Sequence, residues 1–233
     1  MWWIIFPVLF VVSLIIALVI IALRNYNKGD YKDGGGNIIG ANNSTSFFSP
    51  KNERAGVRGE KIANYHLRPL LRNDEYLLGN FLFSLDNERF TEIDCILISR
   101  KGIFCIETKK WVGHISGTDS DDVWIQRYDD PGLDDRSHPN PVKQNNRHCK
   151  LLKRLLDNKY YIENIVIFVN LEDGTGISSG SAFTIREFKN FYRELDSNAL
   201  TIDDVNNVYI KLLPYIASEE KLKDYKNKRS NLN

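Results

Sequence analysis

Three charged side chains interrupt two otherwise apolar stretches of this 233-residue sequence. Asp94 lies in the stretch over residues 92–99, and Glu107 and Lys109 lie in the stretch over residues 102–109. Both stretches are rich in β-branched residues, which predicts two central strands covered on each face. Residues two apart in a strand project from the same face, so Glu107 and Lys109 should lie side by side.

The turn between these strands decides whether Asp94 joins the other two side chains. If Arg100 and Lys101 form a two-residue hairpin loop, or a four-residue loop closes there, Asp94 lies directly opposite Glu107. Opposite residues in an antiparallel pair share a face, with side chains about 5 Å apart. A three-residue loop would instead place Glu107 on the other face. We therefore predict the even register.

Two opposed carboxylates on a half-buried sheet repel each other, and a divalent cation or a shared proton would relieve them. Oxygen ligands favour Mg²⁺ or Mn²⁺ over zinc, and Lys109 can neutralise charge on a phosphate or orient a water molecule. This combination predicts phosphodiester hydrolysis. The alternative is structural: Lys109 pairs with Glu92, directly across in the same register, and Asp94 and Glu107 sit at frayed strand ends.

Additional motifs give this pattern a family resemblance. Asp94 followed by Glu107, Thr108 and Lys109 resembles the PD-(D/E)xK nuclease superfamily. G-x-x-G-E at residues 56–60, E-T-K-K-W-V-G-H-I at 107–115 and N-P-V-K-Q at 140–144 together resemble the nuclease-related domain, NERD. The resemblance implies a restriction-endonuclease-like α/β core. It also implies a catalytic set of Glu60, Asp94, Glu107, Lys109 and Gln144, of which Asp94 and Glu107 would bind Mg²⁺ or Mn²⁺.

Helical periodicity independently places two members of that set. A helix predicted from about residue 55 to 72 puts Glu60 on its apolar stripe. A second helix, opened by Asn140 and Pro141 and running to about residue 157, does the same for Gln144. An unpartnered polar group on a core-facing stripe costs on the order of 1–3 kcal/mol, so both side chains are expected to reach a shared site. Local capping near each helix start is the alternative.

The other predicted elements complete an α/β fold with a mixed sheet flanked by helices. Further strands are predicted over residues 76–85, 123–126 and 162–170, and an acidic, proline-containing loop over residues 129–139. Capping boxes predict helices from Thr184 to about Leu195 and from Thr201 to about Ile216. The expected domains are a nuclease-like core at residues 51–170, its helical extension at 171–220 and a basic tail at 221–233.

The N-terminal segment Trp2–Leu23 is predicted to be a transmembrane helix. It contains no charged residue and is long enough to cross a hydrocarbon core of roughly 30 Å. Arg24, Lys28 and Lys32 follow it, which predicts a single-pass protein of the plasma or inner membrane with its soluble domain in the cytoplasm. Residues 24–50, rich in Asn, Gly and Ser, are expected to be a flexible linker. A buried hairpin of core helices is the alternative.

Basic residues gather around the helix that carries Gln144, although the formal net charge of the chain is only +1. Lys143, Arg147 and Lys150 could follow a phosphate backbone to the site, and a solvated helix face is the alternative. No segment resembles a base-reading module, so we predict little sequence preference. As a separate expectation, the substrate is DNA rather than RNA. The alternative function is a non-catalytic nucleic-acid-binding or signalling module at the membrane.

Cysteine and histidine receive no catalytic role from the sequence. The three cysteines form no C-x-x-C pair and are expected to be free thiols: Cys95, Cys105 and Cys149. The four histidines lack the spacing of a metal site and are expected to be structural: His66, His114, His138 and His148.

Overall fold

The computed structural model describes residues 37–39, 63–84, 90–171 and 176–217, together with residues 221, 224, 225 and 227. All of them belong to one compact unit, Gly35–Asn233. Residues 63–67 are helical. The labelled elements that follow the chain are β1 (Asn37–Ile39), η1 (Arg68–Leu70), β2 (Tyr76–Ser84), β3 (Phe90–Ser99), β4 (Gly102–Lys109), β5 (His114–Thr118), β6 (Val123–Arg127), β7 (Arg136–Pro139), α3 (Pro141–Leu155), β8 (Ile162–Phe168), β9 (Ile177–Ser178), β10 (Ala182–Thr184), α4 (Ile185–Glu194), α5 (Ile202–Leu212) and η2 (Leu213–Tyr215).

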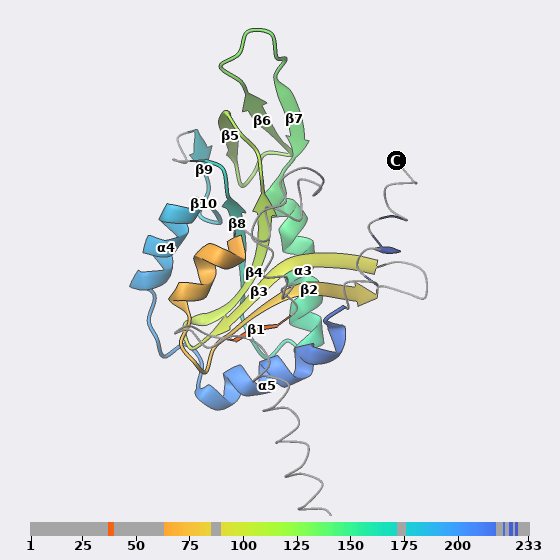
Figure 1. The fold of residues 1–233 in the computed structure, drawn as a ribbon, viewed down its shortest axis with the longest axis vertical. Coiled ribbons are helices and arrows are strands. Elements are labelled where there is room, and N and C mark those ends of the chain that lie inside the picture. Colours follow the sequence, from red (N-terminus) through yellow and green to blue (C-terminus); the bar gives the residue numbers. More distant parts are fainter. Residues whose placement is uncertain are drawn as a thin grey trace, which may run out of the picture. The chain divides into compact units, whose positions relative to one another are not determined.

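A six-stranded mixed sheet forms the centre of this unit, in the order β1-β2-β3-β4-β8-β10 (Figure 1). Strands β2, β3 and β4 are antiparallel, whereas β4, β8 and β10 run parallel. The inner strands β4 and β8 are apolar on both faces because helices cover each side. The mixed α/β class predicted from the sequence is confirmed, and so are the predicted strands β2, β3, β4, β6 and β8 to within a few residues at their ends.

The β3–β4 hairpin has the even register. Ser99 pairs with Gly102 across a two-residue turn formed by Arg100 and Lys101. Gly102 has a φ of 142°, a conformation that glycine adopts readily and other residues rarely do. The pairing continues without a bulge to Cys95 opposite Ile106, which carries Asp94 to the level of Glu107.

Helices cover the two faces of the sheet and bury separate apolar clusters. On one face, α3 supplies Cys149 and Leu152, which pack with Cys105 of β4 and with residues of α5. On the other face, α4 supplies Phe188 and Tyr192, which pack against Phe104 and the helical segment 63–71. Figure 1 shows α3 and the helical segment 63–70 on opposite sides of β3 and β4. The strand pair that carries the acidic residues is therefore held rigidly from both sides.

A second, four-stranded sheet in the order β7-β6-β5-β9 continues from the end of β4 (Figure 1). Its anchor is Trp124, which is fully buried and packs with Phe168 of β8 and Val142 of α3. Gly117 makes room for the indole, since a Cβ atom there would lie 2.4 Å from the Trp124 ring. This sheet corrects the loop predicted over residues 129–139: Arg136–Pro139 is β7, an edge strand that pairs with β6 and has no apolar alternation of its own.

Four further elements differ from the sequence prediction. Asn37–Ile39, inside the expected linker, pairs with β2 as β1. Strands β9 and β10 were not predicted, because each is only two or three residues long. The helix predicted to reach Ile216 ends at Leu212, and Pro214 lies in the following 3₁₀ turn, where proline is compatible with the backbone.

Among the residues that the structure describes, no helix is both long and apolar enough to cross a membrane. The predicted anchor Trp2–Leu23 and the predicted site residue Glu60 lie outside the described residues.

Candidate active site

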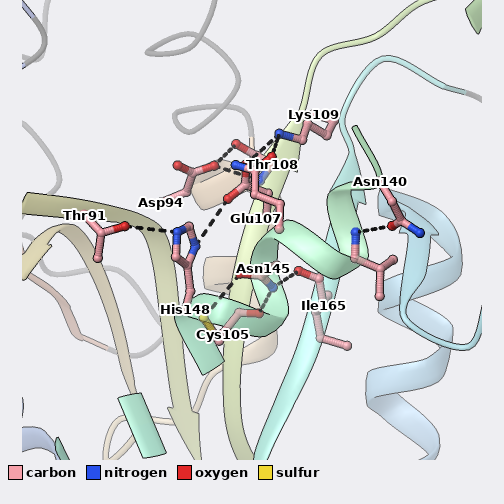
Figure 2. Close-up of polar contacts among 12 residues, drawn as sticks. Thr91, Asp94, Cys105, Glu107, Thr108, Lys109, Asn140, Asn145, His148 and Ile165 are labelled. Atoms are coloured by element: carbon pink, nitrogen blue, oxygen red, sulfur yellow. Dashed lines mark hydrogen bonds and ion pairs between the residues drawn. The ribbon is translucent and has the colours of Figure 1, made fainter. Parts of the chain in front are cut away.

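Four of the five residues predicted for the site lie where β3 and β4 meet the start of α3. Lys109 Nζ lies 2.6 Å from Glu107 Oε1 and 3.2 Å from Gln144 Oε1. The Gln144 amide in turn donates to Glu107 Oε1 at 2.9 Å, so the three side chains form a closed ring of polar contacts. Figure 2 shows Asp94, Glu107 and Lys109 converging on one point. The ion pair of Lys109 is thus made with Glu107 of the same strand.

Asp94 is held in place by the neighbouring strand. The backbone amide and the hydroxyl of Thr108 donate to Asp94 Oδ2 at 2.8 and 2.9 Å. The β3–β4 ladder ends at Cys95 opposite Ile106, so this carboxylate accepts an amide hydrogen that a strand carbonyl would otherwise accept. The two strands separate at this point, and the polar site begins there.

The carboxyl group of Glu107 carries the largest electrostatic strain of the site. Burial first, and then the nearby Asp94 carboxylate, raise its pKa from 4.5 to about 7, against the opposing effect of Lys109. Glu92 adds a smaller contribution of the same sign. Two further carboxylates thus act on Glu107, opposed by the ammonium group of Lys109, which is an environment that favours a bound cation.

Asn145 fixes α3 over the sheet and was not singled out by the sequence prediction. Its buried amide group donates to the carbonyl oxygens of Cys105 at 2.8 Å and Ile165 at 3.0 Å. The Cys105 thiol donates back to Asn145 Oδ1 at 3.4 Å. The sequence did contain a signal that Asn145 faces the core, because Asn145, Cys149 and Leu152 follow helical spacing. The structure shows that all three are buried. Gln144, one residue earlier, is placed over Glu107 by this attachment.

His148 is a second residue that the sequence prediction missed at the site. Its Nδ1 atom lies 3.7 Å from Glu107 Oε2, and its Nε2 atom lies 3.2 Å from Thr91 Oγ1 (Figure 2). The sequence suggested a structural role because the four histidines have no metal-like spacing. The useful signal was its position one helical turn after Gln144, which places both residues on the same face of α3. The two oxygens of Glu107 are therefore approached by residues of one helix.

The start of α3 is tied to the small sheet through Asn140. Asn140 Oδ1 accepts hydrogen bonds from the amides of Val142 and Lys143, at 2.8 and 3.2 Å, which confirms the predicted N-cap. Its amide group donates to the carbonyl oxygen of Asp121 at 2.7 Å, in the turn between β5 and β6. The small sheet thereby helps to place the helix that carries Gln144.

The basic residues predicted along α3 are exposed but are not equivalent. The Lys143 ammonium donates to the Asp122 carboxylate at 2.8 Å and to the carbonyl oxygen of Ser120 at 2.6 Å. This contact lowers the pKa of Asp122. Arg147 and Lys150 lie one and two turns further along the same helix, and both are exposed. Lys143 is therefore engaged with an acidic turn, which reduces the charge it can offer to a phosphate.

The three cysteines are free, as predicted, and the structure shows that all three are buried. Burial and the neighbouring Cys149 thiol raise the pKa of Cys105 well above its ordinary value, so this thiol remains protonated at neutral pH. A thiolate nucleophile is therefore not part of the site at Glu107.

The donor chemistry of the site suits a magnesium-type ion held partly by solvent and substrate. Among the described side chains, no group of three or more His, Cys, Asp and Glu residues could hold a metal ion. Mg²⁺ is commonly bound through only one or two carboxylates, with water and phosphate oxygens completing its shell. Asp94 and Glu107 can supply those two carboxylates, and the strain on Glu107 would be relieved by such an ion.

Comparisons with known proteins agree with the motifs of the sequence. The family profile of the nuclease-related domain (NERD) matches residues 55–169. An uncharacterized protein of Bacillus anthracis is 32% identical over 104 residues, which cover 44% of this chain and 47% of that protein. The probable kinase PglW of Streptomyces coelicolor is 32% identical over 78 residues, which cover 34% of this chain and 5% of that protein. The aligned regions thus span less than half of each relative. No solved structure gives a significant match.

Residues 55–169 of this chain form a nuclease-related domain, consistent with a nuclease-like superfamily.

Proposed function

We propose that the chain is a metal-dependent nuclease that hydrolyses phosphodiester bonds, of DNA rather than RNA, with little sequence preference. The observation that carries this proposal is the convergence of Asp94, Glu107 and Lys109, in which burial and the Asp94 carboxylate raise the pKa of Glu107 to about 7. Strained acidic pairs beside a cation are typical of catalytic sites, because a fold gains no stability from them. The nuclease-related domain supports the same assignment.

Each side chain has a distinct task in this proposal. Asp94 and Glu107 would hold Mg²⁺ or Mn²⁺, and a bound ion of this kind supplies Lewis-acid stabilisation of charge on the phosphate. Lys109 places its ammonium 2.6 Å from Glu107 Oε1, where it can shift to a phosphate oxygen or orient the attacking water. Gln144 keeps both Glu107 and Lys109 in position by donating to one and accepting from the other. Glu60 is proposed to assist.

A second candidate function is nucleic-acid binding without cleavage. One observation favours it: Glu107 Oε1 is already occupied by both Lys109 and Gln144, so this ring of contacts must open before the oxygen can bind a metal ion. A site that remained closed would still present Lys109 to a phosphate. Cleavage assays separate the two candidates.

The test of the nuclease proposal is cleavage of plasmid and linear DNA, and of RNA, by the full-length chain with Mg²⁺ or Mn²⁺ and with excess EDTA. We expect metal-dependent cleavage of DNA that Glu107→Gln abolishes. Glu163→Gln is the matched control, because Glu163 is a half-buried acid on the neighbouring strand β8 and lies outside the proposed set. Cleavage that survives Glu107→Gln, or binding of DNA with no cleavage by the wild-type chain, would refute the mechanism.

We also propose that Trp2–Leu23 anchors the nuclease to the plasma or inner membrane, with the domain on the cytoplasmic side. The support is the charge-free length of this segment and the basic residues Arg24, Lys28 and Lys32 that follow it. Fractionation of cells that express the full chain, or the chain without residues 1–24, tests this proposal. The anchor is ruled out if both forms are recovered in the same fraction.

A further inference from the structure

Three aromatic rings, those of Phe168, Trp111 and His138, lie in contact one after another near the end of β4 that carries Lys109. The Phe168 ring, buried at the end of β8, lies 5.5 Å from the Trp111 ring. The Trp111 ring stacks on the His138 ring of β7 with a centroid distance of 4.1 Å and an interplanar angle of 22°. Trp111 is only two residues beyond Lys109, so this stack lies beside the candidate site. His138 is its last member and is partly exposed.

Hydrogen bonds fix the orientation and the tautomer of His138. Gln126 is buried, and its Nε2 donates to the carbonyl oxygen of Val112 at 2.8 Å. Its amide oxygen must therefore face His138 Nε2, which lies 2.8 Å away. Because that oxygen only accepts, Nε2 carries the proton, and Nδ1 of the neutral ring is left as an acceptor. A buried amide thus holds an imidazole ready to accept a hydrogen bond.

Two cations flank this imidazole. Burial and the positive charges of Arg136 and Lys109 lower the pKa of His138, so the ring is neutral at physiological pH. Arg136 is exposed two residues before His138 on the same face of β7, and its guanidinium lies 5.7 Å from the Tyr128 ring. The positive charges of Arg136 and Lys109 therefore both act on the His138 ring.

The loop between β6 and β7 carries four carboxylates, and two of them are already paired. Asp135 accepts from the Arg127 guanidinium at 3.2 Å, and Asp129 lies 2.8 Å from His114 Nε2. Asp130 and Asp134 leave this loop acidic, which repels a phosphate backbone. Arg136 is the first residue of β7 and directly follows this loop, so the loop repels a polyanion on one side of Arg136 and leaves the side toward His138 and Lys109 favoured.

We propose that Trp111, His138 and Arg136, together the β7 strip, bind one unpaired nucleotide of a single-stranded nucleic acid next to Lys109. The strip's place beside a scissile phosphate rests on the proposed nuclease function. The base stacks on His138 and extends the ring series, and His138 Nδ1 accepts a hydrogen bond from a base or sugar donor. Arg136 contacts the adjoining phosphate. Stacking of this kind requires an unpaired base, so the proposed substrate class is single-stranded or frayed nucleic acid.

This strip is a better candidate for the substrate path than the basic row of α3. Lys143 is engaged by Asp122 and Ser120, and that row contributes no aromatic ring. Single-stranded nucleic acid is commonly bound by positive charge combined with aromatic faces. The β7 strip offers both and runs to the residue proposed to contact the phosphate.

The test is fluorescence anisotropy of the full-length chain carrying Glu107→Gln, titrated with a labelled thymidine oligonucleotide and with a hairpin duplex. We expect His138→Ala to weaken single-strand binding about 10-fold and duplex binding less than 2-fold, since stacking needs an unpaired base. His138→Phe, which keeps a ring, should retain most of the affinity. Arg136→Met should weaken binding of both ligands and reduce the salt slope by about 0.7 for the single strand. Arg186→Met, an exposed arginine of α4, is the matched control.

The inference is overturned if His138→Ala and Arg136→Met bind like the parent chain, or if Arg147→Met weakens binding more than Arg136→Met does. Failure of the inference is distinct from failure of the nuclease proposal. If the chain with its native Glu107 cleaves DNA but the His138 and Arg136 variants bind as tightly as their parent, the proposed role of the β7 strip is wrong and the nuclease proposal is retained. If the His138 and Arg136 variants lose binding but the chain with its native Glu107 cleaves no nucleic acid, the proposed role of the β7 strip is retained and the nuclease proposal is wrong. Absence of all binding overturns the inference as well.

Discussion

Replacing Glu107 by glutamine should stabilise the folded protein at alkaline pH while abolishing the proposed nuclease activity. The carboxyl group is buried, and its pKa rises from 4.5 to about 7 on folding. The folded state therefore holds this proton more tightly than the unfolded state does. The stability contributed by Glu107 is fully present below pH 4.5 and is lost as the pH rises through 7.

The magnitude follows from the same pKa values. Each pKa unit corresponds to about 1.36 kcal/mol, so the rise from 4.5 to about 7 corresponds to roughly 3 kcal/mol of lost stability above pH 7. The amide that replaces the carboxyl group is neutral at every pH and avoids this loss. We expect Glu107→Gln to be more stable than wild type by on the order of 3 kcal/mol at about pH 8.5, and of equal stability near pH 4.5.

Urea unfolding followed by tryptophan fluorescence measures this difference in the full-length chain, with EDTA present. Glu163→Gln is the control, because burial alone raises the pKa of Glu163, so its effect should be smaller. Mg²⁺ added in excess over the EDTA at pH 8.5 should then stabilise wild type but not Glu107→Gln. If Glu107→Gln is no more stable than wild type at pH 8.5, the carboxylate is not strained by burial and by Asp94, and the argument for a cation at this site fails.

Three further outcomes follow from the geometry. Lys109→Met should lower kcat for DNA cleavage by at least about 100-fold with a smaller effect on KM, measured in steady-state assays, and an unchanged kcat would contradict its role. Gly117→Ala should destabilise the fold by roughly 1–3 kcal/mol, because its Cβ would lie 2.4 Å from the Trp124 ring, whereas Gly180→Ala, with nothing within 4 Å, should change the melting temperature little. Asn140→Ala should cost about 1–2 kcal/mol in urea unfolding, since it removes the acceptor of two backbone amides at the start of α3, and an unchanged midpoint would argue against the cap.

The positions of site residues could be predicted where they depend only on residues nearby in the sequence. A two-residue turn at Arg100 and Lys101 sets the register of β3 and β4, so the sequence alone indicated that Asp94 would reach the level of Glu107. Helical spacing likewise indicated that Gln144 would face inward, and the structure places it 2.9 Å from Glu107. In each case the repeat of the secondary structure, two residues for a strand and 3.6 residues for a helix, determines on which face of the element the side chain lies.

Of the small sheet only β6 could be predicted, because the other strands, β5, β7 and β9, depend on partners elsewhere in the chain. Gly117 of β5 pairs with Ile177 of β9, sixty residues along the chain, and β7 contains neither an apolar alternation nor a turn signal. His138 acquires its place beside Lys109 only through this sheet. Sequence spacing therefore gave no reason to connect His138 with the site, whereas His148 could have been found from its helical turn relative to Gln144.

The most direct test of the central claim is the position of a divalent cation. A crystal of the full-length chain soaked in Mn²⁺, with anomalous diffraction recorded, would locate the ion. We predict a peak between the carboxylates of Asp94 and Glu107, with Lys109 displaced from Glu107 Oε1. A metal-dependent mechanism at Asp94 and Glu107 is contradicted if both carboxylates carry no ion at saturating Mn²⁺ and Lys109 keeps its contact with Glu107.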